Sequence, residues 1–196
     1  MHTSRRDRLT VAPRCSTTRR ALRLSWCLTL AAGALASRLH AQAAVPDSVR
    51  YPCRNVHTFD YWEGTWDATP WSKPDAPPGG TLHNTREYDG CVFVERWEGK
   101  GNRGMSMVIY DATKKTWRMF WNDDANSSNV FDDGVYRDGA MRFTGWALGP
   151  RGNLVMASNV LQNVSPDTIR HVFSVSRDSG KTWTVLSDGR FTRRKP

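Results

Sequence analysis

The sequence has no hydrophobic run long enough to span a membrane and none of the common catalytic motifs. Its longest apolar stretch, Leu24 to Ala36, is shorter than the roughly 20 residues that a transmembrane helix needs. The patterns G-x-S-x-G, H-E-x-x-H and G-x-x-x-x-G-K-S are absent, and the three histidines beyond residue 43 lack metal-ligand spacing. No helical period is long enough for a crossover between parallel strands. The sequence therefore predicts no transmembrane segment, no metal site, no cofactor and no parallel sheet.

A strong positive charge is also missing once the N-terminal segment is set aside. Residues 1–43 contain eight arginines and one aspartate, so 28 basic and 19 acidic residues in the whole chain become 20 and 18 beyond them. The net charge falls from +9 to about +2, which removes the main argument for a nucleic-acid partner.

The first 43 residues have the organisation of a secretory signal peptide. An arginine-rich region precedes the apolar stretch, and Ala41-Gln42-Ala43 matches an A-x-A cleavage site. The segment from Thr18 to Arg23 resembles a twin-arginine export signal, and an ordinary signal with adjacent arginines is the alternative. The sequence predicts a periplasmic or secreted protein in either case.

Cysteine is scarce, and only Cys53 and Cys91 lie beyond the signal. In an exported domain two cysteines favour one disulfide, whereas two buried free thiols are the alternative. Residues 44–58 are expected to form an extended arm that this disulfide would hold in place.

Aromatic residues and turn signals are abundant in the rest of the chain. Eight of the nine tryptophans follow the signal, and turn sequences such as Asp89-Gly90 and Asp133-Gly134 recur every eight to twelve residues. Residues alternate between apolar and polar in the segments 105–111, 116–124 and 170–176. We predict an all-β fold for residues 59–196: one antiparallel up-and-down barrel of about ten strands. A two-sheet sandwich is the alternative.

The most informative motif is FDYWEGTWD, from Phe59 to Asp67. The pattern Gly-x-Trp (Gly64-Thr65-Trp66) at the start of such a run of strands is typical of small ligand-holding barrels. Gly64 allows a close approach of the chain, and Trp66 would close the barrel floor. The same density of tryptophan is also expected of a β core that large side chains fill completely.

Four motifs in order along the chain resemble a DUF1579-like family of exported bacterial proteins of unknown function. They are FDYWEGTWD, then Gly90-Cys91 with Glu95 and Trp97, then Tyr110-Asp111 with Trp117-Arg118 and Trp121, and finally Ser176 to Trp183. The resemblance implies a calycin-like or lipocalin-like barrel. It also implies that Arg193 packs over Trp66. Haem binding is not implied, because this chain has no histidine beyond His171.

The segment from Ser176 to Trp183 also matches a single Asp-box, which β-propellers repeat once per blade. One copy in a chain of this size predicts a structural turn. Asp178 would accept hydrogen bonds from backbone amides, Gly180 would supply a positive φ, and Trp183 would anchor the hairpin to the core.

Glu95 is the main candidate for a functional side chain, because it shares a strand face with Phe93 and Trp97. If this face points inward, the carboxylate needs a polar partner, and Arg118 and Arg142 are the available mid-strand cations. The opposite register would place Glu95 in water. The set of candidate ligand-binding residues comprises Glu95, Trp97, Trp121, Arg118, Arg142 and His171.

Two functions of different kinds are consistent with this pattern. The first is a non-catalytic barrel that binds a small apolar or amphipathic molecule. The alternative is a hydrolase or isomerase that uses Glu95, with His171 or an aspartate, in the barrel mouth. A structural or protein-binding module at the cell envelope is a third possibility.

Overall fold

The computed structural model describes residues 44–50, 52–125, 127–149 and 151–195. The expected signal peptide, residues 1–43, lies outside the described residues. No helix in the described part of the chain is long and apolar enough to cross a membrane.

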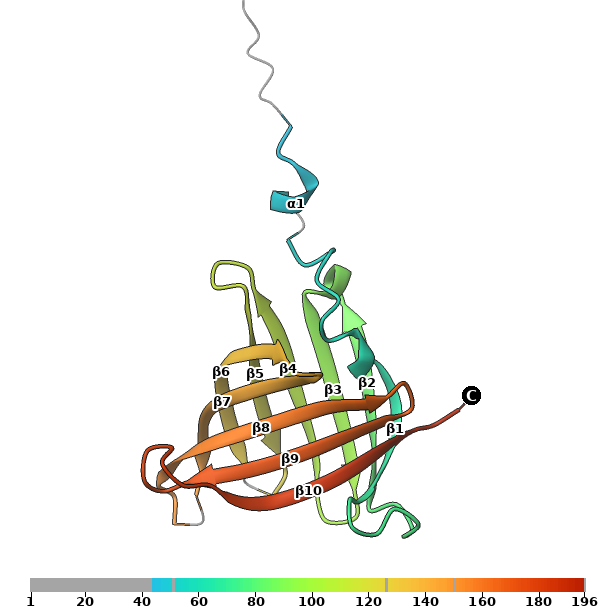
Figure 1. The fold of residues 1–196 in the computed structure, drawn as a ribbon, viewed down its shortest axis with the longest axis vertical. Helices are drawn as coiled ribbons and strands as arrows, with labels where there is room; N and C mark the ends of the chain where they lie inside the picture. Colours follow the sequence, from blue (N-terminus) through green and yellow to red (C-terminus); the bar gives the residue numbers. More distant parts are fainter. Residues whose placement is uncertain (1–43, 51, 126, 150, 196) are drawn as a thin grey trace, which may run out of the picture. The chain divides into compact units, whose positions relative to one another are not determined.

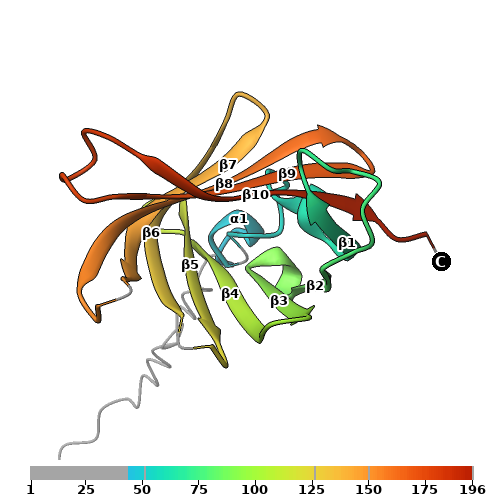
Figure 2. The ribbon, with the colours of Figure 1, turned by 90° about the horizontal axis from the view of Figure 1, so that it is seen from below.

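Ten antiparallel strands form one closed up-and-down barrel (Figure 1). Each strand pairs with its neighbour in sequence, and β1 pairs with β10, so the ring of strands has no open edge (Figure 2). The predicted barrel of about ten strands is confirmed, and the sandwich alternative is wrong. The strands are β1 (Gly64–Pro70), β2 (Gly80–Glu87), β3 (Val92–Gly99), β4 (Arg103–Asp111), β5 (Thr116–Asp123), β6 (Ser128–Arg137), β7 (Ala140–Leu148), β8 (Leu154–Ser165), β9 (Thr168–Ser176) and β10 (Thr184–Arg193).

Side chains alternate between the barrel interior and the outside along these strands, since successive residues of a strand point to opposite faces. On β8, Val155, Ala157, Asn159 and Leu161 are buried, and the residues between them are less buried. The connections that follow β1, β3, β5, β7 and β9 lie at one end of the barrel, which we call the mouth. It is the lower end in Figure 1.

Aromatic side chains fill the opposite end, which we call the floor. The 3-10 helix η1 (Asp60–Trp62) precedes β1 and brings Phe59 and Trp62 into the barrel. The Phe59 ring lies 5.2 Å from Phe93 and 5.8 Å from Trp117, measured between ring centroids. These side chains are almost completely buried, together with Trp66 and Phe143. The floor is therefore a packed core with aromatic pairs in stacked, tilted and edge-to-face geometry.

Arg193 joins the last strand to the floor. Its guanidinium lies 4.1 Å from the centre of the Trp66 ring, as the family resemblance implies. Nη1 donates to the carbonyl of Glu63 at 2.7 Å, and Nη2 donates to the carbonyl of Tyr61 at 3.2 Å. Gly64 has φ +122° and lies beneath this guanidinium, where a Cβ would collide with Nη1. Gly64 is thus required both by its backbone conformation and by the close approach of Arg193.

The disulfide between Cys53 and Cys91 is present, which confirms the predicted pairing. It links the arm to the short 3-10 helix η2 (Tyr88–Gly90), which precedes β3, and Arg54 donates to Asp89 nearby at 3.2 Å. The arm is less extended than expected, because it contains the four-residue helix α1 (Asp47–Arg50) and turns after residue 51.

The Asp-box forms the hairpin between β9 and β10. Asp178 accepts hydrogen bonds from the amide of Thr182 at 2.8 Å and from its hydroxyl at 2.6 Å, and Gly180 has φ +86°. Both predictions are confirmed. The expected contact of Trp183 with the core is wrong, since this side chain is 40% exposed and its indole N–H donates to the carbonyl of Gly180. Trp183 stabilises the turn itself.

Candidate ligand-binding cavity

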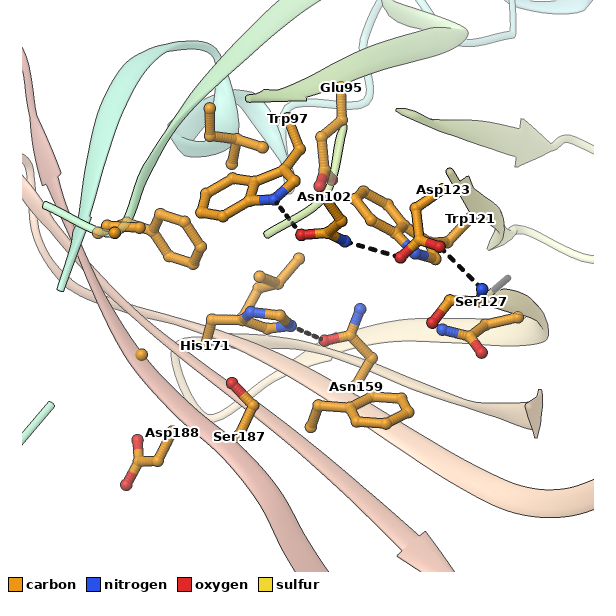
Figure 3. Close-up of a pocket in the computed structure, with 18 of the residues that line it drawn as sticks. Glu95, Trp97, Asn102, Trp121, Asp123, Ser127, Asn159, His171, Ser187 and Asp188 are labelled. Atoms are coloured by element: carbon orange, nitrogen blue, oxygen red, sulfur yellow. Dashed lines mark hydrogen bonds between the residues drawn. The ribbon is translucent and has the colours of Figure 1, made fainter. Parts of the chain in front are cut away.

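A cavity of about 530 Å³ occupies the barrel between the floor and the mouth. Its volume lies within the range of small-molecule sites. Four of the six candidate residues, Glu95, Trp97, Trp121 and His171, line it. Figure 3 shows Glu95 with the two tryptophans on one wall and His171 on the facing wall.

Arg118 and Arg142 lie outside the lining, and the expectation that they pair with Glu95 is wrong. Arg118 lies between the buried Trp117 and Met119 on β5, so its side chain points outward, where Nε and Nη2 bind Asp132 at 2.9 and 2.6 Å. Arg142 lies on the outer face of β7 for the same reason, because its neighbours Met141 and Phe143 are fully buried. Neither of these two arginines is therefore a partner of Glu95.

Glycines beneath the indoles give Trp97 and Trp121 their positions near the mouth. A Cβ on Gly104 would lie 2.7 Å from Cζ2 of Trp121, and a Cβ on Gly99 would lie 2.5 Å from Nε1 of Trp97. Because these glycines have no side chain, both rings can lie flat against the inner face of the sheet. The indoles thus line the cavity wall and leave its interior open.

Glu95 is 7% exposed and lies midway along β3 on the inner face. Its cross-strand neighbours are Asn84 on β2 and Ser106 on β4, and Oγ of Ser106 donates to Oε2 of Glu95 at 2.9 Å. Burial raises the pKa of Glu95 to about 7, while the hydrogen bond from Ser106 and the nearby indole of Trp62 act in the opposite direction. Glu95 can therefore exchange a proton near neutral pH.

Two polar atoms near Glu95 are buried without a hydrogen-bond partner in the described part of the chain. They are Nε1 of Trp62, a donor, and Oδ1 of Asn84, an acceptor. The indole of Trp62 lies close enough to favour the charged form of Glu95, although no hydrogen bond of normal geometry joins them. Nδ2 of Asn84 donates to the carbonyl of Trp62 at 2.8 Å. Buried unpaired groups are rare, and of these two residues only Trp62 lines the cavity.

His171 on β9 forms the polar part of the facing wall. Its Nε2 donates to Oδ1 of Asn159 at 2.6 Å, which places the proton of the neutral ring on Nε2 (Figure 3). Burial lowers the pKa of His171 to about 4, and the nearby Asp188 carboxylate opposes this only partly. His171 is therefore neutral at physiological pH, with Nδ1 as a hydrogen-bond acceptor.

A chain of hydrogen bonds connects the indole of Trp97 to the loop after β5. Nε1 of Trp97 donates to Asn102 at 3.0 Å, and Nδ2 of Asn102 donates to Asp123 at 2.8 Å. Asp123 also accepts the amides of Ala125 and Ser127. Burial alone would raise the pKa of Asp123, but these hydrogen bonds outweigh it and lower the pKa. Asp123 is consequently a fixed negative charge at the mouth.

Sequence reasoning missed the polar partners Asn84, Ser106, Asn102 and Asn159. Asn159 had a usable signal, because it is the one polar residue in the alternating series Val155, Ala157, Asn159, Leu161. Within the described residues no group of three or more histidine, cysteine or acidic side chains is arranged to hold a metal ion.

No protein-family model matches this chain, and no curated protein shows significant similarity to its sequence. The resemblance to DUF1579-like proteins therefore stays a prediction. The barrel and its cavity are the observations on which a function can be argued.

Proposed function

We propose that this protein is an exported, DUF1579-like barrel that binds a small apolar or amphipathic molecule in its central cavity. The observation that carries the proposal is the cavity of about 530 Å³ in a barrel whose floor is tightly packed. A barrel that side chains filled completely would have argued against it. Apolar side chains such as Met119, Leu161 and Phe191 supply much of the lining, and a few polar groups converge on it.

Export is part of the same proposal. The Cys53–Cys91 disulfide supports it, because structural disulfides persist in oxidising compartments such as the periplasm. The N-terminal pattern described above supports it independently.

Native mass spectrometry of protein purified from the periplasm tests binding directly. We expect the wild-type protein to retain a small molecule that denaturation releases. The variant Ser187→Trp places a large side chain at the cavity wall and should lose that molecule. Thr144→Trp, on the exposed outer face of β7, is the matched control and should retain it. Equal retention by both variants would place the molecule elsewhere.

The second candidate is an enzyme that uses general acid–base chemistry. It is favoured by one observation: Glu95, with a pKa of about 7, and the neutral His171 line the same cavity. Such groups are suited to proton transfer at neutral pH. Incubation of the released molecule with wild-type protein and with Glu95→Gln separates the two functions. A binding protein returns the molecule unchanged in both cases, whereas an enzyme converts it only when Glu95 is present.

A further inference from the structure

The ionisable side chains that line the cavity are mostly acidic. Glu95, Asp123 and Asp188 line it, and the described part of the chain contributes no lysine or arginine to the lining. His171, the remaining ionisable group of the lining, is neutral at physiological pH. An anionic ligand such as a fatty acid would therefore meet the carboxylates of Glu95 and Asp123 with no basic side chain of the lining to neutralise its own charge, which is costly in a buried site.

Two of the three carboxylates already have partners within the protein. Asp188 receives a bidentate pair of hydrogen bonds from Arg170, at 2.9 and 2.7 Å. Asp123 accepts one side-chain and two backbone hydrogen bonds. Neither carboxylate needs a ligand to complete its hydrogen bonds.

Glu95 differs from both because its carboxylate is only half satisfied. Oε2 accepts the hydroxyl of Ser106, and the indole N–H of Trp62 lies near the carboxylate without a hydrogen bond of normal geometry. The neighbouring Asn84 directs its amide nitrogen to the carbonyl of Trp62 at 2.8 Å. A carboxylate that is 93% buried and faces a cavity in this state lacks a positively charged partner.

Aromatic faces surround the open side of Glu95. Trp97 lies two residues further along the same strand face, and Trp121 continues the cross-strand row of Glu95 and Ser106. In Figure 3 the Glu95 side chain extends into the space between the two indole rings. A carboxylate flanked by tryptophans is a favourable environment for an ammonium group, because the faces of the indoles attract a cation.

We infer that the ligand of this cavity carries a positively charged amino group, which forms an ion pair with Oε1 of Glu95 between Trp97 and Trp121. The apolar body of the ligand lies against Met119, Leu161 and Phe191, which complete the interior. This inference rests on the proposed binding function and specifies its ligand class: amphipathic amines in place of carboxylic acids.

Three probes that differ chiefly in charge test the inference: 4-phenylbutylamine, 4-phenylbutanol and 4-phenylbutyrate. Binding is measured by isothermal titration calorimetry at pH 8, where the amine and the carboxylate are both charged. We expect the amine to bind at least about tenfold more tightly than the alcohol, and the carboxylate to bind most weakly. Tighter or equal binding of the carboxylate by the wild-type protein would overturn the inference without any variant being needed.

A matched pair of variants assigns the preference to Glu95. Glu95→Gln should lose the advantage of the amine and keep its affinity for the alcohol. Glu98→Gln removes a charge from the same strand on its exposed side and should leave all three affinities unchanged. An amine preference that survives in Glu95→Gln would contradict the inference. If the wild-type protein binds the probes without preferring the amine, only the inference on ligand class fails. If it binds none of them and retains no molecule in native mass spectrometry, the proposed binding function fails as well.

Discussion

The floor and the mouth of this barrel use the same kinds of large side chain for opposite purposes. At the floor, the rings of Phe59, Trp62 and Phe93 pack against one another and exclude solvent. Near the mouth, Trp97 and Trp121 lie flat over glycines and leave a cavity between themselves and the facing strands. The comparison shows that aromatic content alone does not decide whether a barrel is solid or hollow. Near the mouth, the glycines beneath the rings let the indoles lie against the sheet and not across the interior.

The largest effect is expected from a substitution at the floor. Phe59 is completely buried and contacts five other aromatic rings, so Phe59→Ala should lower the free energy of unfolding by about 3–5 kcal/mol. Urea denaturation followed by circular dichroism measures this change. A loss below about 1 kcal/mol would show that the floor is not a close-packed core.

An intermediate effect is expected from Glu95 and His171, between floor and mouth. These two side chains make the free energy of unfolding depend on pH in opposite directions. Burial raises the pKa of Glu95 from 4.5 to about 7. The contribution of Glu95 to the free energy of unfolding is therefore complete below pH 4.5 and is lost as the pH rises to 7. The lowered pKa of His171, from 6.5 to about 4, has the opposite consequence: its contribution is present above pH 6.5 and is lost as the pH falls to 4. The slope from Glu95 is about 1.4 kcal/mol per pH unit.

Single variants separate these two slopes. In Glu95→Gln only the His171 slope remains, and stability should rise with pH between 4.5 and 6.5. In His171→Gln the Glu95 slope remains, and stability should fall over the same range. Chemical denaturation at four or five pH values measures both. Identical pH profiles for the two variants would show that both side chains are solvated and would contradict their burial in the cavity wall.

The smallest effect on stability is expected near the mouth. Trp121→Ala removes a ring that faces open space, so the free energy of unfolding should fall by less than about 1 kcal/mol. Affinity for 4-phenylbutylamine should nevertheless fall by about tenfold or more. A large loss of stability combined with unchanged affinity would reverse the roles that we assign to the two ends.

The sequence was sufficient to predict the barrel and the disulfide, but it left open whether Glu95 faces inward or into water. Turn residues recur at regular intervals, and Glu95 alternates in step with Phe93 and Trp97. The same alternation could have placed Arg118 outside, since Trp117 and Met119 are on the face opposite to it. Charge complementarity alone favours a pair of Arg118 with Glu95, whereas the parity of the strand residues excludes it.

Other features of the site depend on information that no local pattern contains. The partners of Glu95 come from neighbouring strands, so they depend on the cross-strand register, which brings Asn84 and Ser106 to its sides. The pairing of His171 with Asn159 depends on the register between β8 and β9. The volume of the cavity depends on how all the inward side chains divide the interior, which is settled only in three dimensions.

The contact between Arg193 and the floor has a consequence for the order of folding. Arg193 lies 130 residues beyond Glu63, whose carbonyl it binds, so the first and last strands meet across nearly the whole barrel sequence. A ribosome releases the floor residues long before β10 exists, and until then the β1 edge and the Trp66 ring have no final partner. Closure is therefore the most non-local step of folding, and contacts this distant in sequence slow it. During that interval the nascent chain exposes an unpaired strand edge, a vulnerable stage at which a chaperone would protect it from aggregation.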